Sequence, residues 1–237
     1  SSAPADVAAA EAATPSSIIP DPGVPDIAAN VAGTVVKHGR YTVISGHTLF
    51  GDGLPDQFYP IGQADVLIYD DTYNKTLTND GALWNAAEGS HQVIGVLASS
   101  FVWNDGKIVS EVTGGDEFSA AAGVYDIGGD LNNTGEIYGL TDNGLAAGVY
   151  GAVADTINYG LIAARADNGT AVGILREDSG GVVNNASGVI LAEGMQATGV
   201  FIGSYAHVDS KGDEDLVSPT VQNDGLIGAV SLDPDAP

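Results

Sequence analysis

The sequence predicts an all-β fold, a single-stranded parallel β-solenoid preceded by an extended N-terminal arm. Three observations favour it: a short turn unit recurs along most of the chain, a glycine–aliphatic pair travels with that unit, and the composition is rich in glycine and small aliphatic residues. Repeats of 20 to 50 residues are typical of solenoids, propellers and arrays.

The turn unit reads apolar-x-Asn-x-Gly-x-(Ile/Leu/Val), as in Val102–Ile108. One copy carries an extra residue. From the first asparagine the steps are 25, 29, 25, 27 and 38 residues. The asparagines assigned to the unit are Asn79, Asn104, Asn133, Asn158, Asn185 and Asn223.

A second anchor follows each of the first five copies. It is a glycine directly before a valine or isoleucine, so each copy is predicted to hold two short apolar strands. The pairs are Gly95-Val96, Gly123-Val124, Gly148-Val149, Gly173-Ile174 and Gly199-Val200.

Asparagine and glycine both tolerate positive φ and form tight turns. A turn repeated once per coil stacks equivalent residues about 4.8 Å apart. At that spacing asparagine amides can hydrogen-bond to the copies above and below. We therefore predict that the six asparagines form a structural ladder, with columns of aliphatic side chains inside the coil.

Composition agrees with a narrow, thin-cored coil. Hydrophobic residues make up 44% of the 237 residues, and the chain has 33 glycines. After residue 13 no segment keeps a helical apolar stripe for three turns without glycine, whereas short strands between turn signals fit throughout.

The formal net charge is −24, from 31 acidic and 7 basic residues. Nucleic acid and anionic membranes require clustered basic residues, so neither is expected as a partner. No run of 18 apolar residues suggests a membrane span, and there is no cysteine. We expect an extracellular or bacterial cell-surface location, with Ser1 as a mature end left by signal-peptide removal.

The chain divides into an arm and a solenoid. Residues 1–30 are rich in alanine and proline, which favours extended structure; such an arm would have to dock on its own solenoid or on a neighbouring copy. The solenoid spans 31–237, with irregular opening coils at 31–76 and regular coils at 77–202. An insertion at 204–219 and a last coil at 220–230 follow.

No amphipathic capping helix follows the last coil. An uncapped solenoid end is an exposed sheet edge that can pair with another chain. Either the native chain continues beyond Pro237, or this end meets a partner.

The units at 102–109, 131–139 and 156–163 resemble the passenger-domain repeats of bacterial autotransporters and related adhesins. Tyr41–Gly46 is also similar to their first strands. The resemblance covers roughly residues 41–229 and implies a right-handed β-helix on the outside of a Gram-negative cell. The chain lacks the C-terminal membrane barrel of that family, which includes adhesins, proteases, esterases and inert stalks.

Few residues suggest catalysis. Carboxylates with a nearby Arg occur in polysaccharide-cutting β-helices, and the candidates here are Arg165, Arg176, Glu177 and Asp178. The segment that starts at Arg176 precedes a turn, so we interpret it as a solvated loop. The histidines fall in four different coils and are interpreted as surface or loop residues: His38, His47, His91 and His207.

No catalytic or cofactor-binding residues are assigned. Ca²⁺ is considered at Asp209–Asp215, where carboxylates alternate, although Lys211 stands where a ligand is needed. Asp52 with Asp56 and Asp70 with Asp71 are weaker pairs, and four Asn-x-Ser/Thr sequons are attributed to chance.

The leading hypothesis is a secreted structural surface or matrix protein. Its solenoid ends would stack and its arm would dock on a neighbour, giving a filament or layer; the partner is then the protein itself, with extracellular polysaccharide as a further partner. The alternative is a monomeric adhesin or carbohydrate-binding stalk that uses the 204–219 insertion. The third hypothesis is a polysaccharide lyase or hydrolase.

Overall fold

All regular structure in the described part of the chain is β-strand, and no helix there is long and apolar enough to cross a membrane. The computed structural model describes residues 17–23, 30–32, 35–37, 40–52, 54, 56–58, 62–89, 91–151, 154–177, 180–203, 205–208, 214–217 and 219–233.

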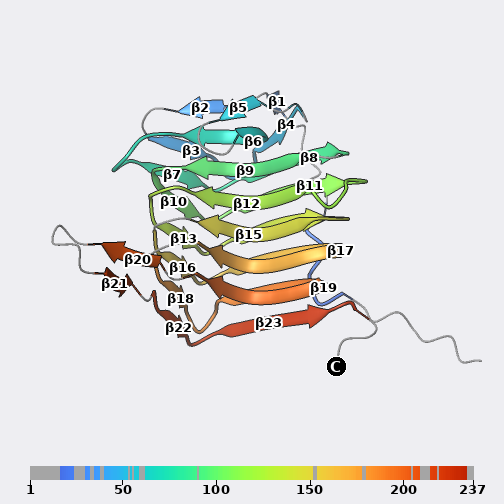
Figure 1. Ribbon diagram of the computed structural model, residues 1–237. Helices are drawn as coiled ribbons and strands as arrows, with labels where there is room; N and C mark the ends of the chain where they lie inside the picture. The colour runs from blue at the N-terminus through green and yellow to red at the C-terminus, as the bar shows by residue number, and fades with distance from the viewer. Residues whose placement is uncertain are drawn as a thin grey trace, which may run out of the picture.

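The strands form three faces of a prism-shaped coil (Figure 1). The first face holds β1 (Asn30–Ala32), β4 (Thr48–Gly51), β8 (Ala82–Glu88), β11 (Lys107–Thr113), β14 (Glu136–Thr141), β23 (Leu226–Ser231) and the first halves of β17 (Leu161–Arg176) and β19 (Val189–Ile202). The second face holds β2 (Val35–Lys37), β6 (Gly62–Asp70), β9 (Gln92–Ala98), β12 (Ala120–Asp126), β15 (Leu145–Gly151) and the second halves of β17 and β19. The third face holds β3 (Tyr41–Val43), β7 (Thr76–Asn79), β10 (Phe101–Asn104), β13 (Leu131–Asn133), β16 (Thr156–Asn158), β18 (Val182–Asn184) and β22 (Val221–Asn223).

Every pairing between coils is parallel, which confirms the predicted β-solenoid; the coil makes about five turns. Two antiparallel hairpins depart from this pattern, one joining β5 (Asp56–Phe58) to β6 and the other joining β20 (Tyr205–Val208) to β21 (Glu214–Val217). Each regular coil has strand segments on three faces rather than the two predicted. The Asn-x-Gly turn lies between two of them, so the turn unit itself contributes to both the third and the first face.

The core consists of vertical columns of aliphatic side chains. On the first face, for example, Ile108 is in register with Leu83 in the preceding coil and with Ile137 in the next coil. Ile162 and Ile190 continue the column, and all five side chains have no exposed surface. A facing column on the second face consists of the Val or Ile of each glycine pair: Val96, Val124, Val149, Ile174 and Val200.

The glycines of these pairs make room for the first-face column. A Cβ on Gly148 would lie 2.5 Å from Cγ2 of Ile162 and 2.8 Å from the carbonyl oxygen of Gly173. Gly123 and Gly173 bear the same relation to Ile137 and Ile190 of the following coil, with Cβ–Cγ2 distances of 2.4 and 2.5 Å. The glycine of each pair is therefore required by core packing.

The predicted segments fall on the structure as follows. Of the N-terminal arm, only residues 17–23 and Asn30 are described, and the remainder of 1–30 lies outside the described residues. The opening coils carry β1 to β6, the regular coils β7 to β19, the insertion the β20–β21 hairpin, and the last coil β22 and β23.

We expect Gly148→Ala to lower the free energy of unfolding by about 1–3 kcal/mol, because the new methyl group overpacks the core against Ile162. Gly228→Ala is the matched control, since its Cβ would meet only the flexible end of Leu191 at 3.1 Å. Urea unfolding followed by circular dichroism measures both variants. Equal stability of the two would contradict this account of the glycine column.

Candidate functional site

The structure places Asn79, Asn104, Asn133, Asn158 and Asn223 in one vertical column on the third face. Along the column, the Nδ2 of one asparagine donates to the Oδ1 of the asparagine in the next coil. The donor–acceptor distances are 2.7 Å from Asn79 to Asn104, 2.8 Å from Asn104 to Asn133, and 2.8 Å from Asn133 to Asn158. These four asparagines are buried, whereas Asn223 in the last coil is exposed.

The buried amides also donate to nearby backbone carbonyls. Nδ2 of Asn133, for example, donates to the carbonyl oxygens of Leu161 at 3.1 Å and Gly135 at 3.3 Å. The ladder begins with an unmet acceptor, because Val43 is in register before Asn79 and offers no donor to its buried Oδ1. Buried polar groups without partners are costly, so the interior of the ladder is more strongly stabilised than its first member.

The prediction that Asn185 belongs to the ladder is wrong, because Asn184 occupies that position in the column. Asn184 is buried, accepts from Asn158 at 2.9 Å and donates to Asn223 at 2.7 Å. The turn therefore has two extra residues before Gly188, rather than one. Asn185 lies in that longer turn, and its Nδ2 contacts the carbonyl oxygen of Asn158 at 3.5 Å.

Close stacking, rather than positive φ, explains the glycine of the turn unit. None of the turn glycines has positive φ. A Cβ on Gly135 would lie 2.0 Å from the carbonyl oxygen of Gly106, and one on Gly160 would lie 2.1 Å from that of Gly135. No side chain fits between turns that stack this closely.

Arg176 is a buried core residue, which corrects its interpretation as part of a solvated loop. Its side chain is fully buried and crosses Gly151 to reach Asp126, two coils away, with an Nη1–Oδ2 distance of 3.4 Å. Nη2 also donates a hydrogen bond to the hydroxyl of Thr156. A Cβ on Gly151 would lie 2.1 Å from Nη1, so the glycine provides the path.

Burial dominates the electrostatics of this pair. It raises the pKa of Asp126 from 3.8 to about 6, although Arg176 and the backbone N–H groups of Gly128 and Gly129 act in the opposite direction. Burial likewise lowers the pKa of Arg176. The attraction between Asp126 and Arg176 therefore offsets the cost of burying both charges, and the pair adds little net stability.

The other catalytic candidates are dispersed. Arg165 lies on the outer side of the first face, where Nε is 2.6 Å from Oδ1 of Asp167. Glu177 accepts a hydrogen bond from the hydroxyl of Tyr150 on the second face. His47 and His91 occupy separate turns. Asp178, His38 and the side chain of His207 lie outside the described residues.

Among the described residues, no three His, Cys, Asp or Glu side chains are arranged to hold a metal. Asp70 is buried and accepts hydrogen bonds from Thr72 and from Ser100, the latter at 3.1 Å. Most of the calcium candidate, including residues 209–213, lies outside the described residues, as do the side chains of Glu214 and Asp215.

A continuous apolar column lies on the outer side of the first face. Its members are in register from coil to coil and hardly exposed, at 0–8% of their surface. They are Trp84, Val109, Tyr138, Ala163 and Leu191. We call this surface the first-face groove. Without a covering segment, such a column would be an exposed apolar patch.

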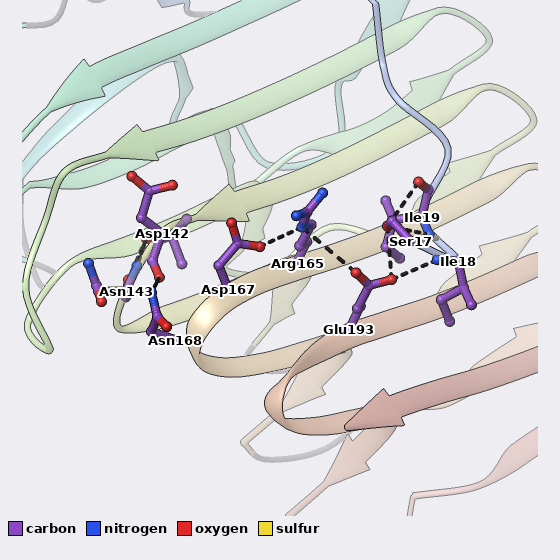
Figure 2. A network of polar contacts seen from close by, with 10 residues as sticks. Ser17, Ile18, Ile19, Asp142, Asn143, Arg165, Asp167, Asn168 and Glu193 are labelled. Carbon is purple, nitrogen blue, oxygen red and sulfur yellow. Dashed lines mark hydrogen bonds and ion pairs between the residues drawn. The ribbon is translucent and has the colours of Figure 1, made fainter. Parts of the chain in front are cut away.

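Residues 17–23 of the N-terminal arm cover the first-face groove. Ile19 packs into the apolar column and is only 7% exposed. The carboxylate of Glu193 accepts hydrogen bonds from the Ser17 hydroxyl at 2.8 Å and from the Ile18 N–H at 2.7 Å (Figure 2). At the other end, Lys107 Nζ donates to the carbonyl oxygen of Pro22 at 2.6 Å.

Charged side chains line both sides of the groove. Lys107 forms an ion pair with Glu136 at 2.9 Å, and Arg165 lies between Asp167 and Glu193 (Figure 2). Clefts of about 450 and 690 Å³ flank the covering segment. Burial raises the pKa of Glu111, and the carboxylates of Asp142 and Asp21 raise it further. The groove therefore has an apolar floor and polar walls.

The covering segment crosses the strands diagonally. Glu193 and Lys107 are three strands apart and four residues apart along the strand direction. The segment bends at Ile18 and Ile19, and the Gly23 N–H donates to the Asp21 carboxylate at 2.8 Å. It reaches from Glu193 to the side chain of Lys107.

The covering segment is held weakly. Burial of Ile19 contributes about 2 kcal/mol, and each hydrogen bond to the Glu193 carboxylate about 2 kcal/mol. Ordering the backbone of residues 17–23 costs about 1 kcal/mol per residue. Gain and cost are similar in size.

The sequence reasoning missed this groove, although a signal was present. Each first-face strand has two consecutive apolar residues, as in Ile137-Tyr138 and Ile190-Leu191. Side chains alternate along a strand, so one of each pair must point outward. A repeated apolar pair in a solenoid therefore indicates a covered outer face.

No protein-family model, no curated protein and no solved structure matches this chain.

We predict that Asn184→Ala lowers the free energy of unfolding by at least about 2 kcal/mol, since it removes buried hydrogen bonds and leaves Asn158 and Asn223 without their partner. Asn185→Ala, one residue away, should cost less than about 1 kcal/mol. Urea unfolding distinguishes the two. The reverse order would show that Asn185 belongs to the ladder.

We further predict a pH window set by Asp126. Its pKa is raised on folding, so its contribution to stability is fully present below pH 4 and is lost as the pH rises through about 6. The unfolding free energy of wild type minus that of Asp126→Asn should fall by about 2 kcal/mol between pH 4 and pH 7. Asp80→Asn, an exposed carboxylate, serves as the control; a flat difference for Asp126→Asn would contradict the assignment.

Proposed function

We propose that this protein is a secreted structural protein of a bacterial surface or matrix, and that its solenoids stack end to end into a filament or layer. The observation that carries the proposal is the open sheet edge of the last coil. Among the described residues, no strand pairs with the outer side of β22 or β23, which lie at one end of the stack (Figure 1). Apolar side chains are exposed there: Val221 48%, Leu226 55% and Val230 37%.

The free backbone groups of this edge can be assigned. In a parallel strand, the N–H and C=O groups of one residue point to one neighbour and those of the next residue to the other. The Thr220 carbonyl accepts from Val182 at 2.9 Å, and the Asp224 N–H donates to Asn184 at 2.8 Å. The N–H and C=O groups of Val221, between Thr220 and Gln222, therefore face the open side.

The opposite end offers a matching edge. Within the described residues β3 pairs only with β7, and β2 only with β6. This end carries Lys37 on β2 and Arg40 just before β3, whereas the last coil carries Asp224 and Asp233. Head-to-tail stacking therefore places bases and acids at one junction, although in different corners of the coil, and tail-to-tail stacking places the carboxylates of both copies there. Salt or Ca²⁺ would relieve the repulsion that a net charge of −24 imposes on a polymer.

The N-terminal arm would extend the contact between copies. Ser17 lies over β19, beside the last coil. The described segment thus begins at the end of the groove where a neighbour would stack. The resemblance to autotransporter passenger and adhesin repeats supports an extracellular setting, with polysaccharide as a further partner.

The β20–β21 hairpin supports a second candidate function, a carbohydrate-binding or adhesive stalk. It projects from the side of the coil (Figure 1). A contact made there would leave the solenoid as a spacer. Binding to glycans that disappears when residues 204–219 are deleted, without polymers, would favour this candidate over the first.

Electron microscopy of the purified protein, with and without Ca²⁺, tests the leading proposal. We expect filaments or layers built from stacked solenoids. Val221→Pro removes an N–H that faces the open edge, at a first strand position that tolerates proline. It should raise the critical concentration for assembly about tenfold.

Val221→Thr keeps this N–H and should assemble as the wild type does. Wild-type particles that stay monomeric under all conditions would contradict the proposal. Equal assembly of the proline and threonine variants would exclude β22 as the contact.

A further inference from the structure

We propose that the first-face groove is a binding site for a short peptide, and that its ligand is the segment Ser17–Gly23 of a second copy of this chain. The copy of that segment on the same molecule occupies the groove when the molecule is alone. The inference rests on the proposed function only in this last respect, that neighbours in an assembly exchange the segment.

The groove forms hydrogen bonds with polar groups at both ends of the segment. Glu193 is 3% exposed, and its carboxylate accepts from the Ser17 hydroxyl and the Ile18 N–H. Lys107 donates to the Pro22 carbonyl. A carboxylate and an ammonium set three strands apart fix both the position and the direction of the bound segment.

The floor selects one side chain between these two anchors. Ile19 is 7% exposed and packs on the column that includes Trp84, Tyr138 and Leu191, whereas the adjacent Ile18 is 38% exposed. The groove therefore contacts the side chain of Ile19 closely and leaves that of Ile18 exposed to solvent. Prolines at positions 20 and 22 restrict the free segment to extended conformations, which lowers the entropy cost of binding.

The segment adds no strand to the coil. It lies across the outer side of strands that already pair with one another, so the coil does not need it for its backbone hydrogen bonds. A tethered segment has an effective concentration of about millimolar. A second copy can compete only when it is held close, as it would be in a stack.

Fluorescence anisotropy with a labelled Ser17–Gly23 peptide tests the site on the full-length chain. Ile19→Asp in the chain places a carboxylate where the apolar floor rejects it. It should release the chain's own segment and allow saturable peptide binding. Release is seen as a red shift of Trp84 emission in a Trp103→Phe background, which removes the chain's other tryptophan. Ile18→Asp is the matched control, which should keep its segment docked and bind the peptide at least about tenfold more weakly.

The peptides themselves provide the specificity control. A peptide with Ile19→Asp should bind the Ile19→Asp chain at least about tenfold more weakly than the wild-type peptide, and one with Ile18→Asp within about twofold of it. Three results would overturn the proposal. Trp84 could stay buried in the Ile19→Asp chain, the released chain could show no saturable peptide binding, or all peptides could bind with equal affinity. Peptide binding by a protein that forms no polymers would support this site and contradict the proposed function. Polymers formed by a protein that does not bind the peptide would support the proposed function and contradict this site.

Discussion

Vertical register between coils is the constraint on which the rest of the structure depends. Parallel strands about 4.8 Å apart place each residue directly above its counterpart. At that distance an asparagine amide donates to the next amide, as Asn104 does to Asn133 at 2.8 Å. The same register aligns Ile108 with Ile137 and Gly106 with Gly135. One spacing therefore fixes the ladder, the core columns and the residues allowed in the turn.

The same register accounts for two surface features, the first-face groove and the open edge of the last coil. It aligns the outward side chains of the first face into a single apolar column, from Trp84 to Leu191, on which residues 17–23 lie. It leaves β22 with backbone groups that no described strand meets. A stacked coil thus has a sheet edge at its end and an apolar groove along its side.

The sequence predicted the solenoid because one turn unit recurs with its asparagine and glycine. Where the chain departs from the period, sequence alone was insufficient. Asn184 and Asn185 both fit the unit, and only the two-residue extension before Gly188 shows which one is stacked. Arg176 looked solvated because its neighbours are polar. Its burial depends on Asp126 and Gly151 in earlier coils, which no local pattern reveals. The groove depends on contact between Ile19 and residues far along the chain.

Nuclear Overhauser effects between the side-chain amides of the ladder test the central claim most directly. The account predicts effects from the Asn104 amide protons to those of Asn133, and from Asn133 to Asn158, because each amide nitrogen lies 2.8 Å from the oxygen of the next amide. It also predicts slow exchange of these protons with solvent, since all three side chains are buried. Rapidly exchanging amides without such effects would show that the coils are not stacked in this register.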